Sequence, residues 1–127
     1  MKDYIPKTKD DLSAVEILKH KSFEDVKAEV SYLLGCLQDL HWDVASEVGA
    51  YLAPHVNEIK DNLLDILLSN DEEWKFGIMK SLIAIAPVKL DEELLFSLER
   101  IRDCPTEREV NEELHLVARE ILEKEIN

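Results

Sequence analysis

The sequence predicts an all-α fold: a short HEAT-like α-α superhelix of about seven helices, in a single domain over residues 1–127. Apolar residues recur along most of the chain with the 3.6-residue period of an amphipathic helix, and no convincing two-residue alternation typical of a strand interrupts them. Only three glycines and four prolines are present, which disfavours a turn-rich β architecture. A chain of 127 residues is long enough to bury one hydrophobic core.

The N-terminal third predicts two helices after a tail over residues 1–9. The segment "KDDLSAVEILKHK", residues 9–21, supplies the apolar face of a short first helix. A longer helix is expected over residues 22–40, because Ser22 and Asp25 have the spacing of an N-terminal cap. The apolar residues that follow this cap form one continuous stripe.

Two similar segments of about thirty residues predict a structural repeat. Trp42 is followed 12 residues later by Pro54, and Trp74 is followed 13 residues later by Pro87. Each proline is expected to end a helix, because its ring cannot continue the helical hydrogen bonds, and a second amphipathic helix comes next. Such pairs are typical of helical-repeat stacks, and an irregular helical bundle is the alternative. The repeats are assigned to residues of about 40–69 and 71–103.

One helix within these repeats differs from the others. The segment 71–86 is apolar almost all round its helical axis, which is typical of a helix covered on several sides, so we expect it at the centre of the fold. A C-terminal helix is expected over residues 107–125, because Thr106 and Glu109 form the pattern of a capping box. The remaining helices of the repeats are expected over residues 43–53, 55–68 and 91–102.

The charge of the chain excludes some partners. The formal net charge is −13, from 28 acidic and 15 basic side chains; residues 1–21 carry +1, so the rest of the chain carries −14. Such a charge repels nucleic-acid phosphates and anionic lipids and attracts basic proteins. We therefore expect no nucleic-acid partner and favour a protein partner that is basic. An ordinary solvated acidic surface would also account for the charge.

Neither a membrane location nor a bound metal is predicted. No apolar run reaches the ~18 residues that would span a bilayer, and the start "MKDYIPKTKDD" lacks the apolar region of a secretory signal, so a cytoplasmic location is expected. Cys36 and Cys104 are too far apart to indicate a metal motif or a disulfide framework. The four histidines lack the spacing of a zinc site, so no metal or cofactor is expected.

No arrangement of residues predicts an enzyme. No serine or cysteine stands in a nucleophile motif, and a His–Asp pair such as His41 and Asp43 would point in different directions from a helix start. The acidic runs 71–73 and 91–93 begin helices, where the helix dipole already stabilises them. The three glycines are isolated within helices and do not form a phosphate loop; we expect them to permit close helix contacts.

The two tryptophans and the acids that precede them form the candidate partner-binding site. In one interpretation each indole is a packing wedge between repeats, and the preceding acid caps the helix. In the other, the indoles form an aromatic ridge on a concave face, where nearby carboxylates add charge specificity. We favour packing, with a binding role retained. The candidates are Gln38, Asp39, Trp42, Asp71, Glu72, Glu73, Trp74 and Lys75.

Three sequence motifs, in this order along the chain, resemble those of a bacterial family of unknown function. They are "YIPKTKDDL" (4–12), "LLGCLQDLHWDVA" (33–45) and "DEEWKFGIMKSL" (71–82). The resemblance covers nearly the whole chain and implies a HEAT-like α-α superhelix, but it implies no activity. Many members have proline after the first tryptophan where this chain has Asp43, which affects only the start of that helix. The matching residues are Gln38, Asp39, Trp42, Trp74 and Lys75.

Taken together, these patterns favour a non-enzymatic protein–protein interaction module with an acidic binding face. A specific version is an immunity or antitoxin-like protein, in which acidic charge steers a basic toxin to the site. One alternative is a HEAT-like enzyme or nucleic-acid-acting protein, such as a base-excision glycosylase, in which Asp39, Trp42 and Trp74 would form the site. The charge disfavours it, because such proteins need a basic groove. The other alternative is a structural subunit of an oligomer; the sequence does not determine the oligomeric state.

Overall fold

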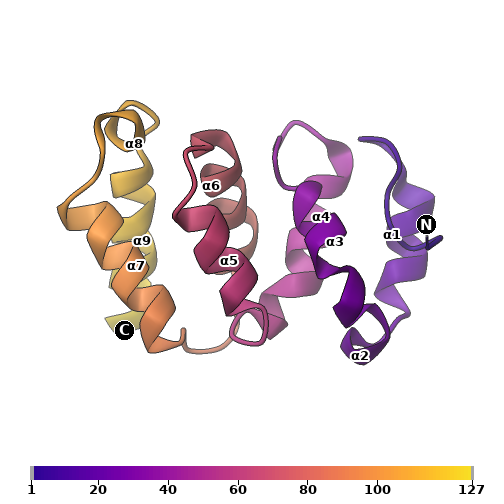
Figure 1. The fold of residues 1–127 in the computed structure, drawn as a ribbon. Coiled ribbons are helices and arrows are strands. Elements are labelled where there is room, and N and C mark those ends of the chain that lie inside the picture. The colour runs from indigo at the N-terminus through magenta and orange to yellow at the C-terminus, as the bar shows by residue number, and fades with distance from the viewer. Residues whose placement is uncertain (1, 127) are drawn as a thin grey trace.

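The structure, a computed structural model, describes residues 2–126. All regular elements of this part of the chain are helical, which confirms the predicted all-α fold. The helices succeed one another in chain order from one end of the molecule to the other (Figure 1). Neighbours in sequence are therefore neighbours in space, as is usual for a stack of helix pairs.

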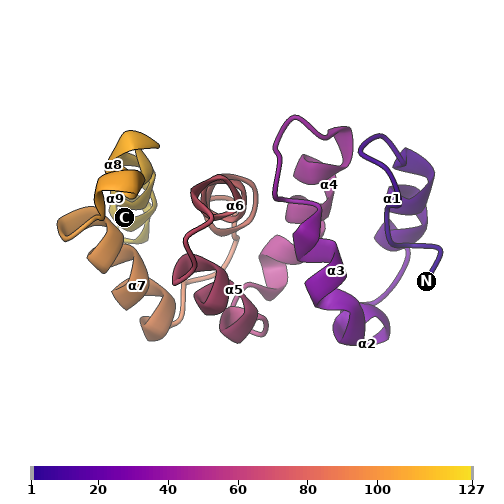
Figure 2. The same cartoon turned by 45° about the horizontal axis from the view of Figure 1, so that its top comes forward.

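The helices lie in two layers, which are most easily separated in Figure 2. Within one layer α1 packs on α4, α4 packs on the π-helical segment η3 that continues α6, and η3 packs on α9. In the other layer α5 packs on α7, and α7 also packs across on α9. The first layer contains α1 (Leu12–Lys19), α4 (Asp43–Leu52), α6 (Glu72–Ile78), η3 (Met79–Ile83) and α9 (Leu114–Ile126). The second layer contains α3 (Val30–Gly35), α5 (Lys60–Leu67) and α7 (Glu92–Asp103).

The segment expected at the centre of the fold is buried. Ile78, Met79 and Leu82 are all 0% exposed, because α6 and η3 are covered by α4, by α5 and by α9. The apolar pattern around this segment therefore predicted its central position correctly.

The expected continuous helix over residues 22–40 is wrong. The chain instead forms α2 (Phe23–Val26), the 3₁₀ turn η1 (Lys27–Glu29) and α3. Tertiary contacts hold this bent path: the Phe23 ring stacks on the His55 imidazole, with ring centroids 4.2 Å apart, and the Tyr51 hydroxyl donates to the carbonyl oxygen of Lys21. Contacts between segments so distant in sequence are not encoded in the local apolar period.

The helix expected over residues 55–68 begins late. Residues Ala53–His55 form the 3₁₀ turn η2, which contains Pro54, and α5 starts only at Lys60. Pro54 thus lies within the first two positions of a new turn, where its missing N–H costs nothing, and α4 has already ended at Leu52.

The C-terminal helix is interrupted, contrary to the prediction of one helix over 107–125. Thr106 and Glu109 do form the predicted capping box at the start of α8 (Glu107–Asn111), but α9 begins only at Leu114. Glu113 between them has a φ of 58°, the left-handed conformation. Val110, expected on the apolar face, is 43% exposed. The break allows α8 to direct Glu109 inward while α9 independently packs on α7.

Two of the three glycines permit close approach of backbones, as expected. A Cβ added at Gly77 would collide with the carbonyl oxygen of Leu37, and one added at Gly49 would collide with the carbonyl oxygen of Ser81. The expectation is wrong for Gly35, where an added Cβ would meet nothing within 4 Å. Gly77 thereby lets the end of α6 lie directly against the turn that follows α3.

We predict that Gly77→Ala lowers the free energy of unfolding by roughly 1–3 kcal/mol, because backbone rather than a flexible side chain must move to admit the methyl group. Gly35→Ala is the matched control and should be neutral or stabilising by up to about 1 kcal/mol. Urea denaturation followed by circular dichroism measures both. Equal effects of the two substitutions would show that the Leu37 contact is not the constraint.

We also predict that Glu113→Gly raises the free energy of unfolding by about 0.5–1 kcal/mol, because glycine adopts a positive φ without a Cβ clash. Glu112→Gly is the control. Glu112 has a φ of −95°, so glycine there only adds freedom to the unfolded chain and should destabilise. Thermal unfolding of the two variants should move in opposite directions; a fall in both would contradict strain at residue 113.

Candidate functional site

A groove of about 870 Å³ lies where the loop between α3 and α4 meets the start of α6 and the short helix α8. The segment that joins α5 to α6 contributes Ser69, Asn70 and Asp71 to its lining. The remaining lining residues are Leu40, His41, Glu72, Glu73, Phe76, Arg108, Asn111 and Glu112. The groove thus brings together the two segments that the sequence singled out, 38–42 and 71–75, with a third segment that it did not.

The first segment reaches the groove through Leu40 and His41. Gln38 is exposed, and Asp39 beside it is partly exposed. The Asp39 carboxylate accepts a hydrogen bond of 2.8 Å from the backbone N–H of His41 and lies 3.0 Å from Nδ1 of the same residue. These contacts, the backbone bond first, lower the pKa of Asp39. Asp39 therefore organises its own loop and does not cap α4, contrary to the packing interpretation.

The two tryptophans occupy different positions. The backbone N–H of Trp74 donates to Oδ1 of Asp71 at 3.0 Å, so here the preceding acid does cap the helix. The Trp74 indole Nε1–H donates to the carbonyl oxygen of Leu34 at 2.9 Å, which ties α6 to α3. Trp42 is itself the N-cap residue of α4, without a side-chain cap bond, and its half-buried ring packs against the core. The groove is lined by neither indole.

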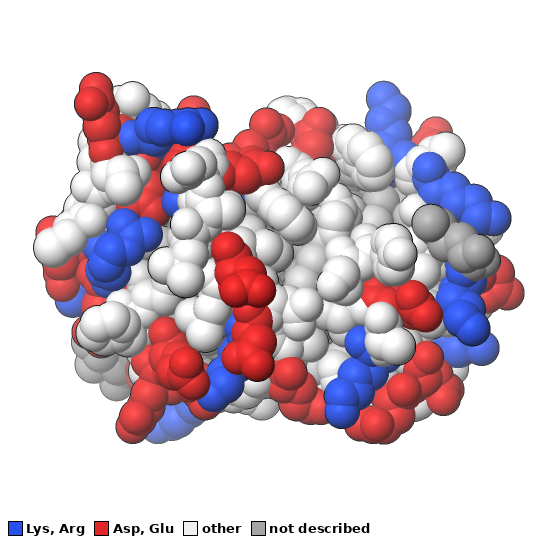
Figure 3. Space-filling model, in the orientation of Figure 1, with Lys and Arg blue, Asp and Glu red and all other residues white. Residues whose placement is uncertain are grey.

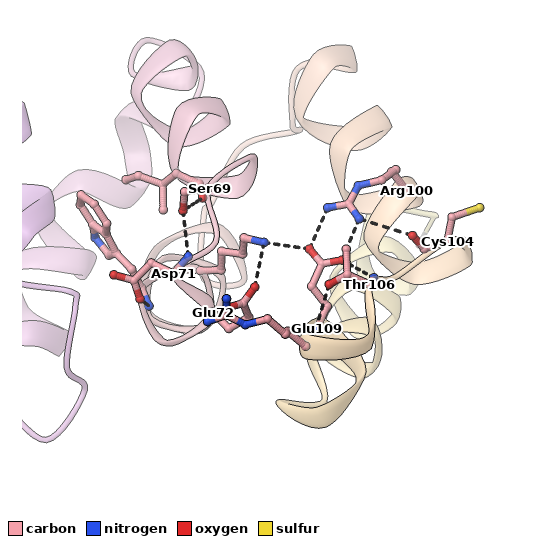
Figure 4. A network of polar contacts seen from close by, with 11 residues as sticks. Ser69, Asp71, Glu72, Arg100, Cys104, Thr106 and Glu109 are labelled. Atoms are coloured by element: carbon pink, nitrogen blue, oxygen red, sulfur yellow. Dashed lines mark hydrogen bonds and ion pairs between the residues drawn. The ribbon is translucent and has the colours of Figure 1, made fainter.

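An ion cluster, which we define as Glu72, Lys75, Arg100, Arg108 and Glu109, adjoins the groove, and Glu72 and Arg108 also line it. Figure 4 labels Glu72, Arg100 and Glu109 of this cluster. Nζ of Lys75 lies 3.0 Å from Oε2 of Glu109 and 3.6 Å from Oε1 of Glu72. These three residues are only 3%, 0% and 6% exposed, respectively. Charges so deeply buried are costly unless they are paired. Lys75 and Glu109 are also hydrogen-bonded to each other, whereas Glu72 is held by ion pairs alone.

Two arginines complete the ion cluster from opposite sides. The Arg100 guanidinium forms a two-pronged contact with the Glu109 carboxylate, at 2.7 Å from Nη1 to Oε1 and 2.8 Å from Nη2 to Oε2. Arg108 places Nη2 3.0 Å from Oε2 of Glu72, with a side chain that is 69% exposed and extends into the groove. The cluster therefore links α6, α7 and α8 by charge.

Glu109 stays ionised in this position. Burial by itself would raise its pKa, but hydrogen bonds from Arg100, from the Thr106 backbone N–H and from Lys75 outweigh burial and hold the pKa at about 2. The Thr106 N–H bond measures 2.8 Å and is the return half of the capping box. One carboxylate thus caps α8 and pairs with two cations from other helices.

The ion cluster changes the list of partner-binding candidates. Glu72 and Lys75 were predicted to face a partner, whereas the structure buries both of them and pairs their charges internally. Glu109, Arg100 and Arg108 were not predicted. The capping-box pattern of Thr106 and Glu109 was read only as a helix start, although it also signals a carboxylate turned back toward the chain.

The groove keeps unpaired negative charge after these pairs are accounted for. Glu73 and Glu112 are exposed in the groove and form no ion pair with any residue that the structure describes. Phe76 and Leu40 supply apolar, partly buried surface between them. On the face shown in Figure 3, a column of acidic side chains runs just left of the centre beside uncharged surface, and most basic side chains lie toward the edges.

The described residues show no other chemical centre. Residues 2–126 contain no group of three or more histidine, cysteine or acidic side chains that could hold a metal ion. Cys36 and Cys104 are both free, and burial raises the pKa of the Cys36 thiol to about 11. No helix in the described part of the chain is both long and apolar enough to cross a membrane.

The fold and the groove define a small all-α protein that has a charged surface groove beside an ion cluster. Residues 4–122 match the family model described as "Domain of unknown function (DUF5071)", and the chain belongs to that family. The resemblance noted in the sequence is therefore confirmed as membership of a family of unknown function. No curated protein matches the chain.

We predict that Glu109→Gln lowers the free energy of unfolding by roughly 3–5 kcal/mol, because it leaves the buried Lys75 ammonium without its closest carboxylate. Glu107→Gln, on an exposed position of the same short helix, is the control and should cost less than about 1 kcal/mol. Urea denaturation at neutral pH measures both. A small loss in Glu109→Gln would show that the ion cluster is not needed for stability.

The same pair of variants gives a pH dependence. The Glu109 pKa is lowered from 4.5 to about 2, so its stabilisation is fully present above pH 4.5 and is lost as the pH falls toward 2. The stability difference between wild type and Glu109→Gln should therefore shrink across this window. The difference between wild type and Glu107→Gln should stay below about 1 kcal/mol throughout. A constant difference for Glu109→Gln would contradict an ionised Glu109.

Proposed function

We propose that the protein is a non-enzymatic interaction module of the HEAT-like helical-repeat type, whose groove between α6 and α8 binds a basic segment of another protein. The observation that carries the proposal is the pair of unpaired carboxylates, Glu73 and Glu112, at a groove with apolar surface at Leu40 and Phe76. A lysine or arginine side chain has an aliphatic stem and a cationic head, and such a groove suits both parts.

The ion cluster supports this proposal because it fixes the walls of the groove. Glu72 and Phe76 belong to α6 and Arg108 belongs to α8, and the pairs Glu72–Arg108 and Lys75–Glu109 join these two helices. A site whose walls are held in place before binding loses less conformational entropy when the partner arrives.

The net charge of −13 supports a basic partner. Long-range attraction raises the rate at which oppositely charged proteins meet, and it weakens as salt increases. A cytoplasmic immunity or antitoxin-like protein that captures a basic toxin is the specific version that we propose. Arg108 in the groove would then help to exclude partners with the opposite charge pattern.

Nothing in the geometry favours the glycosylase-like alternative. Asp39 is engaged by His41, and Trp74 lines a separate pocket of about 230 Å³ beside α3 and α5. Trp42 packs against the core. The three residues of that alternative therefore do not share a groove.

The test compares Glu73→Lys/Glu112→Lys with a matched reversal at the far end of the molecule, Asp3→Lys/Glu24→Lys. All four positions are exposed and form no ion pair within the described residues, and both variants change the net charge equally. Immobilised wild type is expected to retain protein partners from a lysate of the source cells at about 50 mM salt and to lose them at about 500 mM. The groove variant should lose them at low salt, and the control should keep them.

Quantitative mass spectrometry of the retained proteins gives the readout, and circular dichroism checks that both variants are folded. Partners that are retained equally by wild type and by the groove variant would contradict the proposed groove. Partners lost equally by both variants would show that overall charge, rather than the groove, controls retention.

A further inference from the structure

A second groove, of about 560 Å³, lies between α5 and α7 in the other layer of the fold. Leu64 and Leu68 line it from the α5 side, and Phe96 and Ser97 line it from α7. Leu68 and Phe96 are each 74% exposed, more than any other large apolar side chain that the structure describes. Both sit on adjacent packed helices, so the exposed apolar surface is shared across one groove.

Single exposed apolar side chains are ordinary on protein surfaces, but two that converge on one groove are not. Other apolar residues of the same two helices, Leu63, Leu67, Leu94 and Leu98, are 0% exposed and fill the core. Leu68 and Phe96 therefore have no role in that core. Exposed apolar side chains on the two walls of a groove are the usual anchors for a partner helix.

The rim of this groove is acidic. Glu92 lines the groove, and Asp65 and Asp61 lie one and two helical turns before Leu68 on α5, where Asp65 also lines the smaller pocket beside α3. None of these three carboxylates forms an ion pair with a described residue. Glu93 also lines the groove, but its charge is compensated, because Nζ of Lys60 lies 2.8 Å from its Oε1.

The one basic residue in the lining does not offset this charge. Arg100 lines the groove, but both Nη atoms of its guanidinium donate to the buried Glu109 carboxylate. The charge that an occupant meets is therefore that of the exposed acids.

The charge decides between occupants. A second copy of the chain would bring two acidic rims together on a protein of net charge −13, and an anionic membrane would be repelled in the same way. We infer that the α5–α7 groove binds an amphipathic helical segment of another protein. Apolar side chains of that segment, spaced at i, i+3 or i+4, would contact Leu68 and Phe96, and its lysines or arginines would lie beside the acidic rim. This inference rests on the proposed function as an interaction module and adds a second surface to it.

The two grooves are separate. Arg108 lines the first and Arg100 lines the second, and these arginines are joined through the ion cluster that lies between them. No lining residue is shared by the two grooves, so each surface can be altered independently.

The test uses a fluorescent peptide of about 15 residues with leucines at i, i+3 and i+4 and lysines elsewhere, together with a peptide of the same composition in scrambled order. Fluorescence anisotropy measures binding by the intact chain. Leu68→Ser/Phe96→Ser removes the anchors, and Ile85→Ser/Val110→Ser is the matched control, because these side chains are 48% and 43% exposed outside the groove. The patterned peptide should bind roughly tenfold more tightly than the scrambled one, and the anchor variant alone should lose this preference.

Two-dimensional NMR locates the peptide, and the shifted backbone signals are expected in the segments 64–68 and 92–100. Equal binding of both peptides, unchanged binding by Leu68→Ser/Phe96→Ser, or shifts confined to the groove of Glu73 and Glu112 would each overturn the inference. Sedimentation of wild type as a dimer that dissociates in the anchor variant would also overturn it, in favour of a second copy.

The lysate experiment separates the two proposals. Loss of partners in Glu73→Lys/Glu112→Lys, combined with no peptide preference, leaves the proposed function standing while this inference fails. A peptide preference that requires Leu68 and Phe96, with partner retention indifferent to Glu73 and Glu112, contradicts the proposed groove and supports the second surface.

Discussion

The carboxylate of Glu109 is the contact on which this arrangement depends. It is fully buried, and it accepts hydrogen bonds from the Arg100 guanidinium on α7, the Lys75 ammonium on α6 and the Thr106 backbone N–H at the start of α8. Three helices from both layers are thereby joined at one point. The energetic consequence is asymmetric, because removal of one partner leaves an uncompensated charge in an apolar interior.

The ion cluster also divides the surface into regions with different chemistry. On one side Arg108 reaches from the cluster into the groove that contains Glu73 and Glu112, and on the other side Arg100 forms part of the apolar groove between α5 and α7. The cluster contains three cations and two carboxylates, a sum of +1, so the remaining residues carry −14 of the net charge of −13. The excess negative charge of the chain therefore lies at its surface, where it attracts basic partners.

The break between α8 and α9 lets the capping box at the start of α8 also position Glu109 for its contacts with other helices. The capping box of Thr106 and Glu109 starts a helix that lasts only to Asn111, and the left-handed Glu113 redirects the chain into α9. A helix running straight through would have to satisfy both the packing of α9 on α7 and the position of Glu109 with a single axis. The short α8 separates these two requirements.

The sequence by itself determined the all-α fold, the central position of the segment 71–86 and the capping box, because each depends on residues within a few helical turns of one another. Of the candidate site residues that it named, Asp71, Glu72 and Glu73 line the groove, and the other five do not. Tertiary structure alone decided that Glu72 and Lys75 are buried and that Glu109 joins them. It also bent the segment 22–40 and left Leu68 and Phe96 exposed. The physical reason is that a charged side chain on a helix can face water or a distant counter-charge, and the apolar period is the same in both cases.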